Sequence, residues 1–475
     1  MQYIYQQVLQ RLLEHLSQAQ KASLQLLVQR LIVAAGGVER IKGLRLMFVL
    51  DTRQPSVQAL ACLRAAQLSI AARSSATFQL RIATAWQAGM STTARENIES
   101  TFSRLFMHDD PRIDLLVLDA GQLLPYDSRR APSTDQQQAE RQEWLLYGHL
   151  AGGAPLLANF ASHGYLHMAE LARQTLRWKG GVDAIISADP LPDRKRYLAW
   201  SRRSLRNAEL LGVRPIHSCA MSLLERMSEL RSRYLSLLLG QEQAAVQLPE
   251  SDTDYRPALR FIAIDDLVSD RDSPQAERLS RFLGYRFDEQ AYSCARSGGA
   301  NPLLLAHLQG LRAEFVDDTR YRDGIELYLQ QARVLNHWQP GVLEQQRAQA
   351  NDFALQAYGL SEAQLVCQLF GPFLRRGLKL ETFLRRCHPD MLVAVPYLHK
   401  ALRGQPAPEP VVQWLVDISG LPLVILQELY GREPLTGRPA DCLLASLQVR
   451  GADLRHLQVR ATNSTLHRGE QVGNP

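Results

Sequence analysis

Residues 45–68, RLMFVLDTRQPSVQALACLRAAQL, contain the pattern that decides the fold. The run Arg45–Leu50 is short and almost wholly apolar, which is typical of a strand buried on both faces of a sheet. An acid, Asp51, follows it directly, and Ser56–Leu68 then repeats apolar residues at helical spacing. The stretch therefore predicts one strand–loop–helix unit of an α/β fold.

The same alternation continues through residues 41–270. Alternating strands and helices favour a largely parallel sheet that is covered on both faces. A weak run at Ala244–Leu248 raises the number of candidate strands to eight, so a closed (β/α)8 barrel remains an alternative to an open sheet. The other predicted strands are Arg45–Leu50, Phe78–Ala83, Ile113–Leu118, Pro155–Asn159, Ala184–Ser187, Arg214–His217 and Arg260–Ile264.

The sequence divides into four segments. Residues 1–40 carry apolar positions at helical spacing and predict a helical hairpin that packs on the next domain. Residues 41–270 form the predicted α/β domain, and residues 271–460 a predicted α-helical domain, because strand patterns nearly vanish there. Residues 461–475, ATNSTLHRGEQVGNP, are polar and predict a disordered tail whose removal should not lower the melting temperature.

Composition excludes several classes of protein. The chain has 475 residues, of which 46% are hydrophobic and 21% charged, as in folded proteins of more than one domain. Its apolar runs are far shorter than the roughly 20 residues of a transmembrane helix, and it lacks a secretory signal. The six cysteines form no CxxC pair. We therefore expect a cytoplasmic protein without a transmembrane segment.

The net charge of +6 is mild for this length, and the arginines are scattered. A nucleic-acid-binding protein is expected to show a dense basic stripe with interleaved aromatic residues. The sequence has only short basic patches, so we expect no nucleic-acid partner.

Four predicted strands end in an acid. The acids are Asp51, Asp119, Asp189 and the pair Asp265-Asp266. The carboxyl ends of parallel strands meet at one edge of a sheet, where the ligands of α/β proteins bind. Clustered carboxylates there would suit a divalent metal bound together with a phosphorylated ligand. The competing interpretation is that each aspartate caps the helix or turn that follows it.

The segment 158–193, ANFASHGYLHMAELARQTLRWKGGVDAIISADPLPD, adds a resemblance. A helix that carries Arg173, a Gly-Gly turn, a short apolar strand and an acidic, proline-rich turn follow one another. This order resembles the middle of a GT-A nucleotide-sugar glycosyltransferase, in which the strand ends in a DxD metal motif. Ser187-Ala188-Asp189 has one acid where two are usual. The stretches FVLDTRQP and LLVLDAG resemble strands of family-2-like members, and a fainter likeness runs to the clostridial glucosylating toxins.

The resemblance implies roles for residues on the donor side. Asp51 or Asp119 would lie near the nucleotide, and Arg173 would belong to the substrate-binding residues. Asp189 would bind the Mn²⁺ or Mg²⁺ that bridges the donor diphosphate. The resemblance thus implies a nucleotide-sugar donor and a divalent metal.

It also implies roles near the reacting bond. Arg194 and Lys195 would neutralise the departing phosphate, and Asp265 or Asp266 would act as the base on the acceptor hydroxyl. Two alternatives stay open. A pseudoenzyme or assembly factor would act through protein partners, with the helical half as the binding region. A barrel would instead favour hydrolase or lyase chemistry.

Overall fold

The computed structural model describes residues 2–74, 76–150, 152, 156–207, 220–239, 259–268, 274–286, 302–332 and 343–432. The chain divides into a first unit, residues 1–141 and 164–295, and a second unit, residues 142–163 and 296–475. Two of the boundaries between the units fall inside helices, one in α5 (Thr134–Leu150) and one in α6 (Leu156–Arg177). The third boundary follows residue 295. The segments predicted as strands at 214–217 and 244–248 and the predicted tail at 461–475 lie outside the described residues.

The first unit contains a six-stranded sheet in the order β4-β3-β2-β1-β5-β6. Every neighbouring pair is parallel except β3 and β4, which are antiparallel. This confirms the prediction of an α/β fold with a largely parallel sheet. The strands are β1 (Arg45–Val49), β2 (Gln79–Ala85), β3 (Ile113–Asp119), β4 (Gln122–Pro125), β5 (Ala184–Ser187) and β6 (Arg260–Ala263).

The sheet is open, so the barrel alternative does not describe it. A barrel would need β1 to pair with β6. Instead, Leu46 of β1 lies opposite Leu80 of β2 on one side and opposite Ala184 of β5 on the other, so both edges of β1 are used. Within the described residues β6 pairs with β5 and lies at an edge of the sheet. The chain order runs outward from β1 in both directions, which is the doubly wound arrangement with its switch point between β1 and β5.

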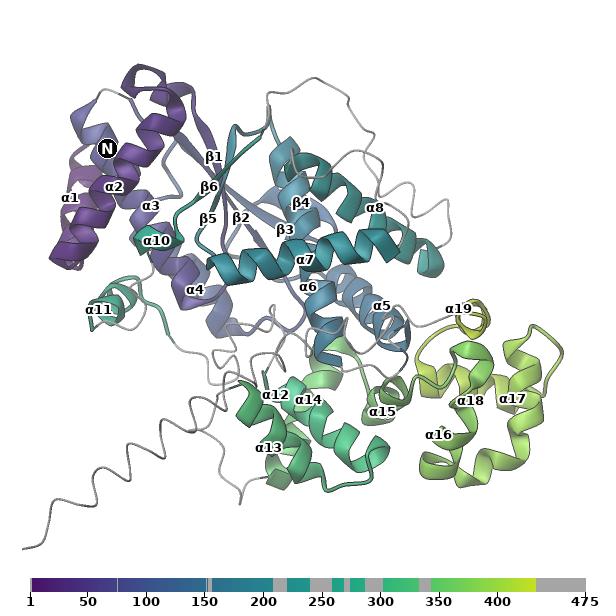
Figure 1. The fold of residues 1–475 in the computed structure, drawn as a ribbon. Coiled ribbons are helices and arrows are strands. Elements are labelled where there is room, and N and C mark those ends of the chain that lie inside the picture. The colour runs from purple at the N-terminus through teal and green to yellow at the C-terminus, as the bar shows by residue number, and fades with distance from the viewer. Residues whose placement is uncertain are drawn as a thin grey trace, which may run out of the picture. The chain divides into compact units, whose positions relative to one another are not determined.

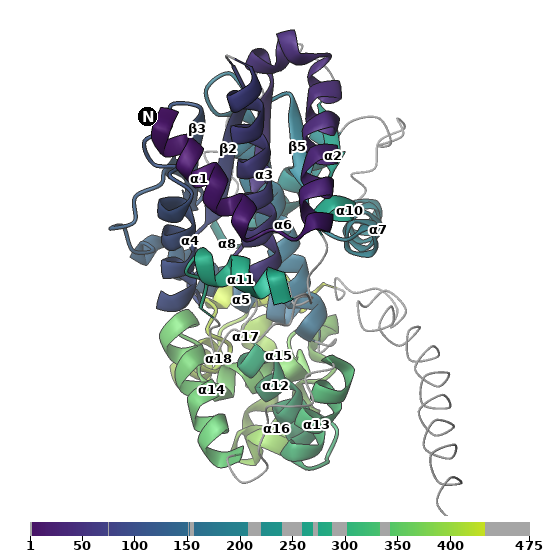
Figure 2. The ribbon, with the colours of Figure 1, turned by 90° about the vertical axis from the view of Figure 1, so that its left-hand side faces the viewer.

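Side chains alternate between the two faces of the sheet. Phe48, Ile82 and Val117 belong to the large hydrophobic core that also contains residues of α1 to α4 and α11. Leu116 faces the other way and packs with Leu171 of α6. Figures 1 and 2 show α1, α2 and α3 together on one side of the strands. The other helices of this unit are α1 (Gln2–Glu14), α2 (Gln18–Ala35), η1 (Val38–Gly43), α3 (Gln54–Arg73), α4 (Thr92–Arg104), α7 (Leu191–Asn207), α8 (Ala220–Leu239), α10 (Asp265–Val268) and α11 (Pro274–Phe282).

Two local predictions differ from the structure. The segment 155–159 was predicted as a strand, but residues from Leu156 onward belong to α6. A short apolar run fits a buried helix as well as a strand, and here it continues into a 22-residue helix. The strand β4 was not predicted. It returns from β3 through the two-residue turn Ala120-Gly121, where both residues have positive φ, 48° and 75°. Such turns match the twist of a hairpin, but an alanine at positive φ gives no sequence signal.

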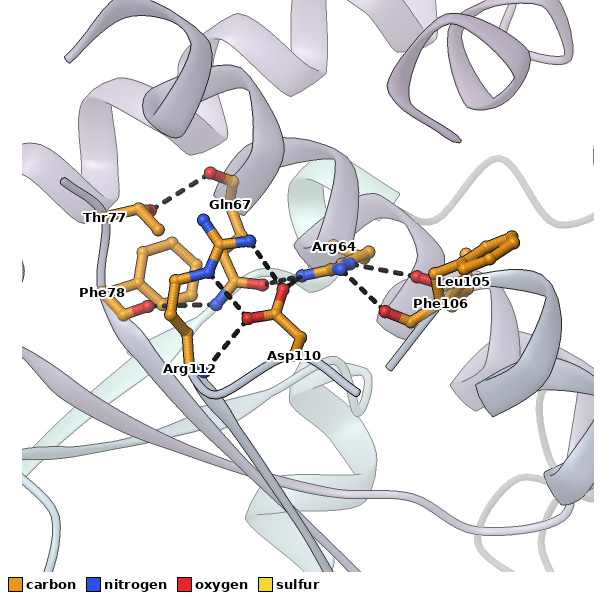
Figure 3. A network of polar contacts seen from close by, with 8 residues as sticks. All are labelled: Arg64, Gln67, Thr77, Phe78, Leu105, Phe106, Asp110 and Arg112. Atoms are coloured by element: carbon orange, nitrogen blue, oxygen red, sulfur yellow. Dashed lines mark hydrogen bonds and ion pairs between the residues drawn. The ribbon is translucent and has the colours of Figure 1, made fainter. Parts of the chain in front are cut away.

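A buried polar network joins α3 to the loop that precedes β3 (Figure 3). The Arg64 side chain is fully buried, and its Nη1 lies 2.8 Å from Asp110 Oδ2 and 2.6 Å from Gln67 Oε1. Its Nε and Nη2 donate to the carbonyl oxygens of Leu105 and Phe106 at 3.2 and 3.0 Å. The guanidinium therefore links the backbone that follows α4 to helix α3 by hydrogen bonds.

All the regular secondary structure that the structure describes in the second unit is helical, which confirms the prediction of a helical region after the α/β fold. Helix α12 packs with α13 and α14, α15 packs with α18, and α17 packs with α18 and α19. Among the described residues no single helix is long and apolar enough to cross a membrane; only α18 and α19 taken together reach that length, and they are bent by 80°. The helices are α12 (Pro302–Leu311), η3 (Arg312–Val316), α13 (Tyr321–Ala332), α14 (Leu343–Tyr358), α15 (Glu362–Phe370), η5 (Arg375–Gly377), α16 (Leu380–Cys387), η6 (Pro389–Ala394), α17 (Val395–Leu402), α18 (Glu409–Ser419) and α19 (Leu423–Tyr430).

Candidate functional site: a charged cluster at the switch point

The fold brings two of the strand-end acids together. Strands β1 and β5 are parallel neighbours, with Phe48 opposite Ile186, so the residues that follow them leave the same edge of the sheet. Asp51 comes two residues after the end of β1, and Asp189 two residues after the end of β5. The two carboxylates therefore lie on either side of the switch point, where doubly wound folds bind their ligands.

Arg53 joins these two acids. Its Nε donates to Asp51 Oδ2 at 2.6 Å, and its Nη2 forms ion pairs with Asp51 Oδ2 and, at 3.5 Å, with Asp189 Oδ1. The backbone N–H of Arg53 also donates to Asp51 Oδ1 at 2.9 Å. The neighbouring carboxylates raise the pKa of Arg53 further above its ordinary value, with Asp51 the larger cause. The guanidinium is thus a permanent cation at the switch point.

The Asp189 carboxylate is hydrogen-bonded to Ser187 but remains accessible to solvent. Its Oδ2 accepts a hydrogen bond from the Ser187 hydroxyl at 3.1 Å, and its backbone N–H donates to the same hydroxyl oxygen at 3.2 Å. Partial burial, followed by the negative charge of Asp51, raises the pKa of Asp189. The side chains of Asp189 and Arg53 are 54% and 44% exposed, so a ligand can reach both.

Helix α7 begins directly after this loop and adds charged side chains. Arg196 pairs with Asp193 at 3.0 Å, and Arg194 pairs with Asp265 at 3.0 Å, next to the end of β6. Lys195 is exposed. Asp51 and Asp189 are therefore joined at the switch point by Arg53, while Asp265 follows the neighbouring strand β6 and pairs with Arg194 of α7.

An aromatic cluster stands beside the charges. The ring of Tyr165 in α6 lies 5.1 Å from Tyr197 and 5.0 Å from Trp200, both in α7. Burial raises the pKa of Tyr165. The positive charge of Arg196 lowers this pKa, and the negative charge of Asp193 raises it. Tyr197 directly follows Arg196 in α7, so the aromatic cluster lies on the helix that carries the charged side chains.

Asp119 has a structural partner of its own, Ser133, whose hydroxyl in turn accepts from the backbone N–H of Gln136 at the start of α5. Its Oδ1 accepts hydrogen bonds from the backbone N–H and the hydroxyl of Ser133 at 3.2 and 3.0 Å, just before α5. It leaves the same sheet edge as the other acids, but β2 separates its strand from β1. The structure thus places Asp119 at the end of β3, where it is bonded to Ser133 and not to the residues around Asp51 and Asp189.

Asp266 and Arg173 form ion pairs of their own. Asp266 accepts two hydrogen bonds of 2.8 Å from Arg30, which ties α2 to the start of α10 and lowers the pKa of the carboxyl. Arg173 is buried and pairs with Glu170 at 2.6 Å, and Ser228 of α8 donates to the same carboxylate at 2.8 Å. The hydrogen bonds of Arg173 within the described part of the chain go to Glu170, and none reaches the residues of the switch point.

Sequence reasoning missed several residues of the cluster, above all Arg53, Asp193 and Tyr165. The spacing Asp189-x-x-x-Asp193, with two prolines between, could have indicated that the second acid lies in the first turn of the helix after the strand. Arg53 stands only two residues from Asp51, a distance at which a long side chain readily returns to the carboxylate. Nothing in the sequence near Tyr165 indicates that its ring meets those of α7.

The cluster does not fit a divalent metal as it stands. Both oxygens of Asp51 accept from Arg53, and the two oxygens of Asp189 face Arg53 and Ser187. In the part of the chain that the structure describes, no three or more His, Cys, Asp or Glu side chains are grouped so as to hold a metal ion.

No family model, curated protein or solved structure matches this chain.

Proposed function

We propose that the first unit binds a nucleotide-sugar donor at the switch point between β1 and β5 and transfers its sugar to an acceptor. The observation that carries the proposal is the meeting of Asp51 and Asp189 through Arg53. These residues come from the two loops that flank the switch point, and in doubly wound sheets ligands bind at that place. The resemblance of residues 158–193 to a GT-A transferase adds the class of ligand.

The neighbouring groups suit the parts of such a donor. Carboxylates accept hydrogen bonds from sugar hydroxyls. The rings of Tyr165, Tyr197 and Trp200 offer aromatic faces on which a nucleobase can stack. The first turns of α7 carry Arg194 and Lys195, and cations at a helix N-terminus favour a phosphate.

Of the two acids after β6, Asp265 is the better candidate for the base on the acceptor hydroxyl. Arg30 holds Asp266 as a carboxylate with a lowered pKa, which weakens it as a base. Asp265 pairs with Arg194 through one contact of 3.0 Å and lies beside the end of β5, nearer to the proposed donor.

The test is calorimetric titration of the full chain with UDP and with GDP. We expect Asp189→Asn to weaken binding about tenfold, since one charge-assisted hydrogen bond contributes roughly 1.5–3 kcal/mol. The matched control is Asp114→Asn, which changes a carboxylate near the amino end of β3. The proposal fails if neither nucleotide binds, or if the control variant weakens binding as much as Asp189→Asn.

A specific observation favours a second candidate, a non-catalytic scaffold that acts through protein partners. Each strand-end acid already has a partner inside the chain: Arg53, Ser133, Arg194 or Arg30. Carboxylates paired in this way can simply hold loops and helices on the sheet. Absence of nucleotide binding, together with a lower melting temperature for Asp266→Asn, would support this candidate.

A further inference from the structure

The GT-A resemblance assigns a metal ion to Asp189, where that metal would bridge the donor diphosphate. In the structure, the cation that contacts Asp189 is the Arg53 guanidinium. Here the Nη2 of Arg53 contacts Asp51 Oδ2 and lies 3.5 Å from Asp189 Oδ1. The guanidinium therefore bridges the acid that the resemblance assigns to the metal and the acid that it places near the nucleotide.

We infer that Arg53 is the built-in cation of this site and that the chain binds its ligand without a divalent metal. The statement about the ligand rests on the proposed function, whereas the exclusion of metal rests on the contacts of Arg53 alone. An arginine is always charged and presents a planar fork of N–H donors that suits both carboxylates and phosphates. It can therefore supply positive charge to a phosphate while it stays anchored to the acids.

The chain holds Arg53 in place from two directions. Its backbone N–H donates to Asp51 Oδ1 at 2.9 Å, and its Nε donates to Asp51 Oδ2 at 2.6 Å, so one residue engages both oxygens. It directly precedes α3, where Pro55 lies in the first turn. A free cation would have to displace a side chain that is tethered two residues from its carboxylate.

Charge counting shows what its removal would do. Asp51, Asp189 and Asp193 carry three negative charges, and Arg53 and Arg196 carry two positive ones, which leaves −1 for the five residues. Without Arg53 the sum is −2, and the carboxylates of Asp51 and Asp189 lose their shared partner. Oxygen ligands with excess negative charge are what Mn²⁺ and Mg²⁺ require.

The decisive experiment measures Mn²⁺ binding to the full chain, without nucleotide, by electron paramagnetic resonance. We expect Arg53→Gln to gain a Mn²⁺ site at least tenfold tighter than any in the wild type, and Arg53→Gln combined with Asp189→Asn to lose it. Arg53→Lys keeps the charge and should exclude Mn²⁺ like the wild type. The matched control is Arg45→Gln, which removes an arginine at the other end of the same strand. Circular dichroism checks that each variant is folded.

A second measurement separates this inference from the proposed function. Wild-type affinity for UDP should change less than twofold between EDTA and Mn²⁺. If no nucleotide binds but Arg53→Gln gains the Mn²⁺ site, the proposed function fails and the role of Arg53 as the built-in cation stands. If the wild type binds Mn²⁺ and Asp189→Asn abolishes that binding, the inference is overturned. A folded Arg53→Gln variant without a new Mn²⁺ site also overturns it.

Discussion

The buried pair Arg64–Asp110 offers the sharpest test of how the first unit is held together (Figure 3). Both side chains are 0% exposed. The Asp110 carboxylate accepts one N–H from Arg64 and three from Arg112, at 2.6–3.0 Å. Replacing Asp110 with Asn removes the negative charge and turns an NH2 group toward these donors. Arg64 then remains buried with Gln67 and two carbonyl oxygens as its only described acceptors.

The size of the effect follows from two estimates. Burial opposes ionisation, but hydrogen bonds from Arg112 and the charge of Arg64 outweigh it and lower the pKa of Asp110 to about 2. Relative to its ordinary value, this corresponds to roughly 2 kcal/mol of stability at neutral pH. The folded-state pKa lies below that of the unfolded chain, so this contribution is present above pH ~4 and is lost as the pH falls toward 2. An uncompensated buried arginine costs more, about 3–5 kcal/mol.

We therefore expect Asp110→Asn to lower the free energy of unfolding of the first unit by about 3–5 kcal/mol at pH 7. Hydrogen exchange in increasing urea, followed in peptides of β2 and β3, reports on this unit alone. Arg112→Gln is the matched comparison: it leaves the Arg64–Asp110 pair in place, and because the Arg112 side chain is 25% exposed, its loss should cost roughly 2 kcal/mol. The double substitution Arg64→Met/Asp110→Leu should recover most of the loss, because no charge is left buried.

Two results would refute this reasoning. A loss below about 1 kcal/mol for Asp110→Asn would mean that Arg64 finds other partners or water. An equal loss for Arg112→Gln would mean that the outer arginine, and not the fully buried pair, carries the stability.

Two further predictions concern the second unit. Burial lowers the pKa of His149 and of His307 to about 4 each, so both must stay neutral in the folded state; stability should fall below pH ~6.5, by about 2 kcal/mol per histidine at pH 5. Thermal melts at pH 7.5 and 5 should show this loss of stability in the wild type, and the loss should be about half as large in His307→Gln. An unchanged pH dependence in His307→Gln would contradict the role of His307 as a buried neutral histidine. A Cβ on Gly324 would stand 2.2 Å from the carbonyl oxygen of Gln309 in α12, so Gly324→Ala should destabilise by about 1–3 kcal/mol in urea denaturation. Gly431→Ala, where a Cβ meets nothing within 4 Å, should be neutral, and equal effects of both would disprove the close helix approach.

The sequence by itself determined the local elements of the first unit and the acids at their ends. Apolar runs such as Arg45–Leu50 fix a strand because only a buried, extended segment can hide them, and the following helix fixes the parallel direction of the next strand. Parallel strands place their carboxyl ends at one edge, so the pattern predicted that Asp51, Asp119, Asp189 and Asp265 leave the sheet at the same edge. The helical character of the second half followed from its 3.6-residue periodicity in the same way.

Only the tertiary structure decided which of these acids meet and what neutralises them. Strand order places β5 and not β3 beside β1, so Asp189 joins Asp51 while Asp119, at the end of β3, binds Ser133. The contact between Arg53 and Asp189 spans 136 residues of sequence. Local propensity cannot specify such a pair, because it depends on the crossover connections and on the register of the whole sheet. The sequence therefore predicted carboxylates at this edge, and the fold put a guanidinium between two of them.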